Sequence, residues 1–183
     1  MLNYLVRLGW SHGDQEFFSR QELIEVFDIE HIGRSAGVFD TEKLLALNAD
    51  HIQATTTAEL VQPLSPFMKD HGITIEAGSF IERVIDTLKP RSKTLKDMAQ
   101  QALFYYIEDI TYEEKAERKV FKPAALEPLK LLADKLEALD DYTEENLENV
   151  FKEVMDETGL KLGKIAQPVR VALTGKTASP GIF

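Results

Sequence analysis

The sequence contains no cysteine among its 183 residues. Neither a disulfide framework nor a cysteine-based zinc site can therefore be built from it. It also lacks any apolar run of the roughly 20 residues that a membrane-spanning helix needs. The apolar start at Leu2–Trp10 has no basic region before it and no small-residue cleavage site after it, so we interpret it as a helix of the fold and not as a signal peptide. These absences favour a cytoplasmic protein without a membrane partner.

Patterns typical of β-strands are scarce as well. Only Val169–Leu173 could form a short extended segment, and no obvious second segment would pair with it. Elsewhere apolar residues recur at helical spacing, most clearly between Thr143 and Gly159, which would end that helix. Capping-box patterns at Ser19–Glu22 and Ser79–Glu82 predict the starts of two further helices. The sequence therefore predicts an all-α fold of short-helix bundles.

Proline and threonine positions suggest where the helices are interrupted. Pro63 and Pro66 predict an irregular or broken helix, because a proline inside a helix removes an amide donor and crowds the preceding turn. Thr55-Thr56-Thr57 and Lys119–Pro123 are the best candidates for joints between helical regions.

The formal net charge of −10 at first argues against a nucleic-acid partner. Acidic residues are concentrated in residues 134–157, however, and two other segments contain bases and no acid. We call residues 87–96 the first basic segment and residues 160–183 the second basic segment. Their bases are Lys89, Arg91, Lys93 and Lys96, and Lys161, Lys164, Arg170 and Lys176. This segregation indicates a local anionic partner, while chance clustering on solvated loops is the alternative that composition leaves open.

Two short motifs imitate nucleotide-binding signatures. His31-Ile32-Gly33-Arg34 resembles the start of the HIGH signature of class I aminoacyl-tRNA synthetases, but it follows a predicted helix, whereas that signature follows a Rossmann strand and opens a helix. Gly175-Lys176-Thr177 resembles the end of a P-loop, which requires glycine where this sequence has Arg170. None of the four histidines pairs with a carboxylate at ligand spacing. We therefore expect no catalytic residue and no metal site in this chain.

Six stretches in the same order along the chain match one family. They are Leu2–Ser11, Val38–Leu44 with Leu47-Asn48, Lys89–Leu95, Leu126–Leu129, Thr143–Leu147, and Lys161–Gly175 with Ser179–Phe183. Together they resemble the C-terminal part of bacterial glutamyl-tRNA synthetases, the class I glutamate–tRNA ligases. Because the matches are colinear and cover essentially the whole chain, they are far more specific than any one of them.

The resemblance implies three regions. Residues 1–55 would be the end of a stem-contact domain, residues 56–108 a first helical anticodon-binding subdomain, and residues 109–183 a second one without its final helix. The catalytic domain, which in this family uses ATP and Mg²⁺ to activate glutamate, would precede residue 1. This chain would then hold no cofactor, would be inactive alone, and would act as a monomer that binds tRNA(Glu).

The resemblance also implies roles for residues of the two basic segments. Arg91 matches the residue that reads the last anticodon base in enzymes strict for glutamate tRNA, where less strict enzymes carry glutamine. The positions that receive the other two anticodon bases match Arg170, Ser179, Pro180 and Ile182. The expected phosphate contacts are Lys89, Lys93, Lys164 and Lys176. An arginine fork offers paired donors to a base, and a small hydroxyl, a proline and an apolar side chain suit an unstacked base.

Two other interpretations remain open. The chain could be a freestanding helical RNA- or protein-binding module derived from such an enzyme, which an upstream reading frame with HIGH-like and KMSKS-like motifs would exclude. An unrelated helical scaffold would require all six family matches to be accidental.

Overall fold

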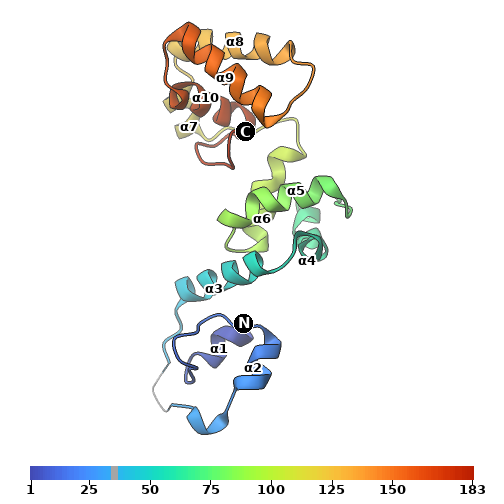
Figure 1. Ribbon diagram of the computed structural model, residues 1–183, viewed down its shortest axis with the longest axis vertical. Coiled ribbons are helices and arrows are strands. Elements are labelled where there is room, and N and C mark those ends of the chain that lie inside the picture. The colour runs from blue at the N-terminus through green and yellow to red at the C-terminus, as the bar shows by residue number, and fades with distance from the viewer. Residues whose placement is uncertain (34–36) are drawn as a thin grey trace. The chain divides into compact units, whose positions relative to one another are not determined.

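The computed structural model describes residues 1–33 and 37–183, and every regular element within them is a helix (Figure 1). The chain divides into two compact units, Met1–Ala102 and Leu103–Phe183. The predicted all-α fold is thus confirmed. The predicted joint at residue 55 lies inside the first unit, between two of its helices, and the three-region division stays a prediction. No helix of the described residues is long and apolar enough to cross a membrane.

The first unit holds six α-helices and two short 3-10 turns among its described residues. They are α1 (Leu2–Val6), α2 (Arg20–Val26), η1 (Ile29–His31), α3 (Thr41–Ala54), α4 (Thr57–Lys69), α5 (Ser79–Leu88), η2 (Lys89–Arg91) and α6 (Leu95–Ala102). The second unit follows with a further 3-10 turn and four α-helices. They are η3 (Leu103–Tyr105), α7 (Glu114–Val120), α8 (Pro123–Glu137), α9 (Glu144–Thr158) and α10 (Leu162–Thr174).

Side-chain caps start several of these helices. Ser19 and Glu22 form the expected capping box of α2, and Asp40 accepts from two amides at the start of α3. Thr143 caps α9, and Gly159 ends it in the left-handed conformation, which lacks a steric penalty only for glycine. The side chains of Ser, Thr and Asp can bond to nearby backbone amides, which favours these residues at helix starts and disfavours them in helix interiors. They therefore define where α2, α3 and α9 begin.

Three local predictions were wrong. α5 begins at Ser79 itself, after Gly78, and has no side-chain cap. Val169–Leu173 lies inside α10, because burial of Val171 against the core outweighs the strand preference of β-branched residues. α4 continues through Pro63 and Pro66, since its buried face packs against α5 and α6 and compensates for the lost amide donors.

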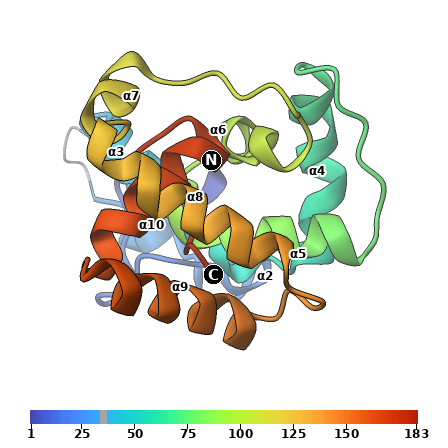
Figure 2. The same ribbon diagram turned by 90° about the horizontal axis from the view of Figure 1, so that it is seen from above.

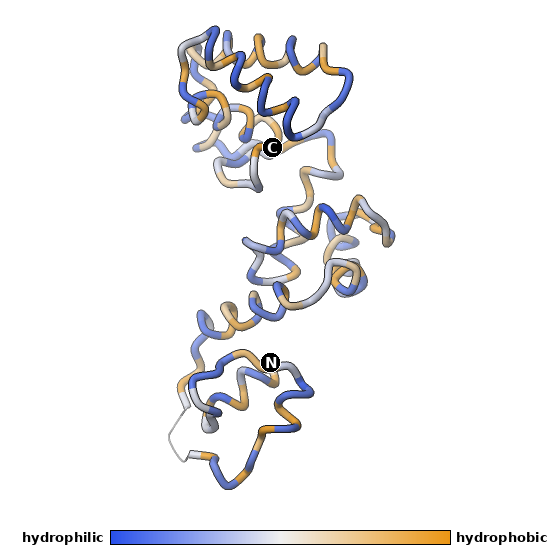
Figure 3. Tube along the Cα trace, viewed as in Figure 1, coloured by the Kyte–Doolittle hydropathy of each residue, from blue (hydrophilic) through white to orange (hydrophobic). Residues whose placement is uncertain are grey.

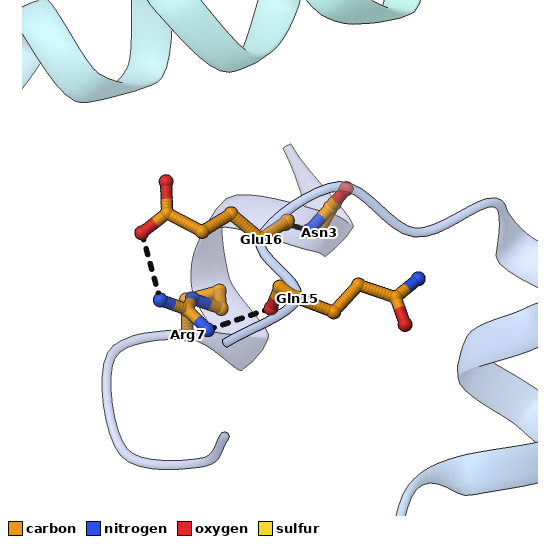
Figure 4. Close-up of polar contacts among 4 residues, drawn as sticks. All are labelled: Asn3, Arg7, Gln15 and Glu16. Atoms are coloured by element: carbon orange, nitrogen blue, oxygen red, sulfur yellow. Dashed lines mark hydrogen bonds and ion pairs between the residues drawn. The ribbon is translucent and has the colours of Figure 1, made fainter. Parts of the chain in front are cut away.

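A small aromatic core closes the N-terminal part of the first unit. Trp10, Phe18 and Leu23 are buried together. Asn3 is 3% exposed, and its side chain donates to the carbonyl of Glu16 at 2.9 Å and accepts from the amide of Phe18 at 2.8 Å. These two bonds and the contacts of the neighbouring Arg7 to residues 15 and 16 fasten the segment before α2 onto α1. Figure 4 shows the contacts of Arg7 and the bond of Asn3 to Glu16.

The rest of the first unit is a bundle of α4, α5 and α6, which contact one another pairwise. Leu64, Met68, Ile85, Leu88 and Met98 have no exposed surface and form its centre. The helix α3 contacts η2, the turn that follows α5. This contact brings residues of α3 to the first basic segment.

In the second unit α8, α9 and α10 pack against one another, and α10 also contacts α7. Figure 2 shows α8 and α9 running beside each other. Along both helices hydrophilic and hydrophobic residues alternate at helical spacing (Figure 3). The buried cluster between the three helices consists of Leu132, Val150, Phe151, Val154, Ile165 and Ala166. It supports α10, which carries most of the second basic segment.

Candidate nucleic-acid interface

The first basic segment turns sharply after α5. Pro90 has no amide donor and lies within η2, where the amide of Ser92 reaches the carbonyl of Lys89 at 3.4 Å. The Ser92 side chain is 2% exposed and donates to the carbonyl of Leu88 at 2.9 Å. The turn is therefore anchored to the end of α5, and Arg91 is its last, exposed residue.

The ends of this turn are also bonded to α3 and the residue that follows it. Lys89 Nζ donates to the carbonyl of Thr55 at 2.6 Å, and Asn48 Nδ2 donates to the carbonyl of Lys93 at 2.7 Å. The side chain of Lys93 lies 3.5 Å from the carboxylate of Glu42, but both groups are more than half exposed, so this pair contributes little. Of the predicted phosphate contacts, Lys89 and Lys93 thus have partners within the fold.

In the second basic segment a hydrogen bond joins two residues nine positions apart. Arg170 Nε donates to Ser179 Oγ at 2.9 Å, and that hydroxyl lies 3.0 Å from the carbonyl of Pro180. Three residues that the sequence assigns to anticodon binding therefore lie together. Arg170 and Ser179 are half-buried, whereas Pro180 is buried.

The last residues of the chain are used by the core of the second unit. Ile182 packs against the buried cluster between α8, α9 and α10, and the ring of Phe183 meets that of Phe151 edge-on at 5.1 Å. Ile182 is half-buried, so part of its surface stays accessible. Its packing also fixes the end of the segment that holds Ser179.

A glycine turn fixes the start of the same segment. Gly175 ends α10 with φ of 72°, and its carbonyl accepts from the amide of Glu113 at 2.9 Å. A β-carbon at this position would overlap with the carbonyl of Thr111. Only glycine combines this conformation with this close approach. The hydroxyl of Thr174 supports the turn by accepting from the amide of Lys176 at 3.3 Å.

The two remaining predicted phosphate contacts lie at opposite ends of α10. Lys164 is exposed in its first turn, and Lys176 follows its last residue and is half-buried. From Lys164 to Thr174 the helix rises by about 15 Å, and Lys176 follows two residues later. They could contact two different phosphates but not the same one.

Six acidic residues make α9 the most acidic helix of the second unit. Lys135 bridges Glu153 at 2.7 Å and Glu157 at 2.9 Å, and its hydrogen bonds to these two carboxylates raise the pKa of Lys135. Residues 160–183 carry four bases and no acid. The charge of the second unit thus changes from acidic on α9 to basic on α10, while residues 108–117, next to the end of α10, add five acids.

The motifs that imitate nucleotide sites lie in unsuitable places. His31 belongs to η1, where its ring meets the carboxylate of Asp28 at 2.9 Å, and Arg34 lies outside the described residues. Gly175-Lys176-Thr177 follows the C-terminus of a helix, whereas a P-loop cradles phosphates at a helix N-terminus. In residues 1–33 and 37–183 no group of three or more histidines or acids could hold a metal ion.

Sequence patterns assign no role to the residues that shape these segments. Asn48 belongs to a family-like stretch, but a single polar residue on a helix does not reveal a bond to residue 93. The backbone carbonyl of Thr55 carries no sequence signal at all. Gly175 stands out in the sequence only as part of the P-loop imitation, although a glycine directly after an apolar helix is the usual signal of a helix end.

Comparison with known proteins identifies a family and named relatives of this chain. A family model described as an anticodon binding domain matches residues 56–183. The glutamate–tRNA ligase of Desulfosudis oleivorans is 55% identical over all of this chain and 39% of its own length. That of Syntrophobacter fumaroxidans is 50% identical with the same coverage. The chain thus spans 39% of the length of these curated relatives.

Solved structures share the fold. A glutamate tRNA ligase from Elizabethkingia meningosepticum, crystallised in complex with its amino acid, matches with a TM-score of 0.86 at 23% identity over 99% of this chain and 36% of its own. A glutamate-tRNA synthetase from Elizabethkingia anophelis matches with a TM-score of 0.80 at 24% identity, over 99% of this chain and 35% of its own. At such identities the similarity shows the fold alone.

Proposed function

We propose that this chain binds the anticodon arm of a tRNA, because it belongs to the anticodon-binding domain family. We further propose that it serves as the tRNA-reading part of a glutamate–tRNA ligase and that its partner is tRNA(Glu). Support comes from relatives of that name, which are up to 55% identical over the whole chain. Activation of glutamate with ATP and Mg²⁺ would belong to the remainder of the longer enzyme, which we expect to act as a cytoplasmic monomer.

The bond between Arg170 and Ser179 is the observation that carries the proposal for this chain. It restrains the Arg170 guanidinium, whose Nε lies 2.9 Å from the hydroxyl, within a segment that has four bases and no acid. A fixed guanidinium can offer its terminal nitrogens to a base edge or a phosphate at a smaller entropic loss than a mobile one. Unpaired anticodon bases are the part of a tRNA that such a side chain can reach, because their edges are exposed.

In this proposal Arg91 reads the last anticodon base, and the other two bases lie against Arg170, Ser179, Pro180 and Ile182. Lys93, Lys164 and Lys176 supply phosphate contacts that position the RNA without reading its sequence. Because Arg91 matches the strict enzymes of the family, where less strict ones carry glutamine, the proposal extends to discrimination against glutamine tRNA.

Binding of labelled anticodon stem-loops, measured by fluorescence anisotropy at several salt concentrations, tests the proposal. The stem-loop of tRNA(Glu) should bind more tightly than one altered at the last anticodon base, with affinity that falls steeply with salt. Arg91→Gln should lower the discrimination between these two stem-loops by about 1–3 kcal/mol. Lys96→Gln removes the same charge from the same segment and should weaken both stem-loops equally.

The proposal fails if the two stem-loops bind equally to the unchanged chain. Its enzymatic part has a separate test, since the chain alone should show no glutamate-dependent exchange between ATP and pyrophosphate. Any such exchange would place a catalytic site in these residues and contradict the assignment. Sedimentation at several protein concentrations would check the monomer.

A further inference from the structure

The turn that carries Arg91 depends on residues far away in sequence. Within its own segment, η2 has one long backbone bond at 3.4 Å and a proline without an amide donor. The hydroxyl of Ser92 anchors the turn to the end of α5. The bonds that close the turn on both sides come from α3 and its C-cap.

The two bonds meet α3 in its middle and at its end. Asn48 and the C-cap Thr55 are seven residues apart, which is about 10 Å along the axis at the rise of an α-helix. The carbonyl of Thr55 accepts from Lys89 at the start of the turn, and the side-chain amide of Asn48 donates to the carbonyl of Lys93 just after it. Arg91 lies between these two points of attachment, which restrain its backbone.

We infer that Asn48 and Lys89 are positioning residues that set where Arg91 stands and thereby tune discrimination at the last anticodon base. This inference rests on the proposed function of Arg91. Both Asn48 and Thr55 precede residue 56, where the match to the anticodon-binding domain begins. Base selectivity at this position thus depends on a helix outside the matched domain.

The inference changes the role of Lys89. As a phosphate contact, Lys89 would need its ammonium group in solvent, but that group lies 2.6 Å from the carbonyl of Thr55 and the residue is half-buried. A lysine that contacts phosphate contributes to the salt dependence of binding, whereas a lysine bonded to a carbonyl in both the bound and unbound protein does not. The two roles therefore differ in a measurable quantity.

The first experiment measures affinity for matched and last-base-altered tRNA(Glu) anticodon stem-loops with Asn48→Leu, which keeps the shape and removes the donor. The ratio of the two affinities should fall roughly threefold to tenfold, as expected for one lost hydrogen bond. Affinity for the altered stem-loop should not change. Asn146→Leu is the matched control, because Asn146 makes the same kind of bond to the carbonyl of Asp141 at 3.0 Å in the second unit. It should leave the ratio unchanged.

The second experiment uses Lys89→Met, which keeps the aliphatic stem. The affinity ratio should fall as it does for Asn48→Leu, and the slope of log affinity against log salt should stay that of the unchanged chain. A slope reduced by about 0.7, with both stem-loops weakened equally, would make Lys89 a phosphate contact and overturn its positioning role. Lys89→Arg, which keeps a donor, should retain most of the discrimination.

An unchanged ratio in both Asn48→Leu and Lys89→Met, with Arg91→Gln still lowering it, would overturn the inference and leave the proposed function standing. If the unchanged chain bound the matched and altered stem-loops equally, the proposed function would be contradicted, and the inference with it. Thermal unfolding of each variant guards against global effects. If Asn48→Leu unfolds early, Asn48→Gln, which keeps an amide on a longer arm, must restore part of the ratio for the inference to stand.

Discussion

The two basic segments are held in place by different means. The first one takes its fixed points from α3, through bonds between residues 34 and 45 positions apart. The second one is fixed by a bond between residues nine positions apart, Arg170 with Ser179, and by the close backbone approach of Gly175 to Thr111, 64 positions earlier. Long-range bonds at an exposed surface are individually weak, whereas a backbone approach that excludes a β-carbon is strict. Changes at the first segment should therefore alter base selectivity, and changes at the second should alter stability as well.

Gly175→Ala should give the largest effect and test the strictness of the second segment. The substitution combines an unfavourable left-handed backbone with an overlap against the carbonyl of Thr111. We expect the second unit to lose about 3 kcal/mol or more of its free energy of unfolding. Guanidinium unfolding followed by far-UV circular dichroism measures the loss. The fluorescence of Trp10, the single tryptophan, reports on the first unit and should not change.

Gly159→Ala separates the two causes. Gly159 has nearly the same φ, 68° against 72°, but a β-carbon added to it would meet no other atom within 4 Å. This variant should therefore lose only the free energy of the unfavourable backbone conformation, about 1–2 kcal/mol. Equal losses in the two variants would show that the approach of Gly175 to Thr111 is relaxed and that residues 175–183 are not held there.

Much of this arrangement follows from sequence patterns, but the decisive contacts do not. Local rules predicted the starts of α2 and α9 and the end of α9, because caps and helix stops depend on a few adjacent residues. They failed for Pro63 and Pro66 and for Val169–Leu173, where packing with distant helices outweighs local preference.

The candidate site divides in the same way. Family resemblance and charge segregation indicated Arg91 and Arg170, and the structure brings Arg170 and Ser179 together. The bonds of Asn48 and Lys89 could not be predicted, since they join residues whose proximity arises only when α3 packs against η2. The burial of Pro180 could not be predicted from the sequence either, because it results from how the last residues fold onto the second unit.

Ser179→Ala should have a smaller effect and test whether the two segments act independently. It removes the acceptor of Arg170 Nε, so affinity for every stem-loop that keeps the first two anticodon bases should fall by about 0.5–1.5 kcal/mol. Discrimination at the last base should not change. The affinity loss of the double variant with Asn48→Leu should equal the sum of the single losses within about 0.5 kcal/mol, because the two residues share no partner. Strong non-additivity would contradict separate reading of the bases.

Lys135→Met tests how the stability of the second unit responds to alkaline pH. Hydrogen bonds to Glu153 and Glu157 raise the pKa of Lys135, so its contribution is complete below its ordinary pKa of 10.5 and is lost as pH rises through the higher, folded value. Burial also raises the pKa of Tyr106 in this unit; that residue, present in both proteins, does not alter the comparison. The unchanged chain should therefore lose more stability above about pH 10 than Lys135→Met does. Equal alkaline losses would mean that the two ion pairs are not formed in solution.

The first unit should respond to acid, with the smallest effect of the series. Burial lowers the pKa of His51, whose ring lies 4.6 Å from that of Phe17; the positive N-terminus adds to this shift and Asp50 opposes it. A base with a lowered folded pKa contributes stability that is present above its ordinary pKa of 6.5 and is lost as pH falls through the lower, folded value. Unfolding followed by Trp10 fluorescence should therefore show a less stable first unit at about pH 5.5 than at about pH 7.5. His51→Gln, which cannot titrate, should reduce that difference, whereas His71→Gln, at an exposed position beyond α4, serves as the matched control. A difference that persists in His51→Gln would assign the acid response to other groups and leave α3, with Asn48 and the Arg91 turn, insensitive to pH.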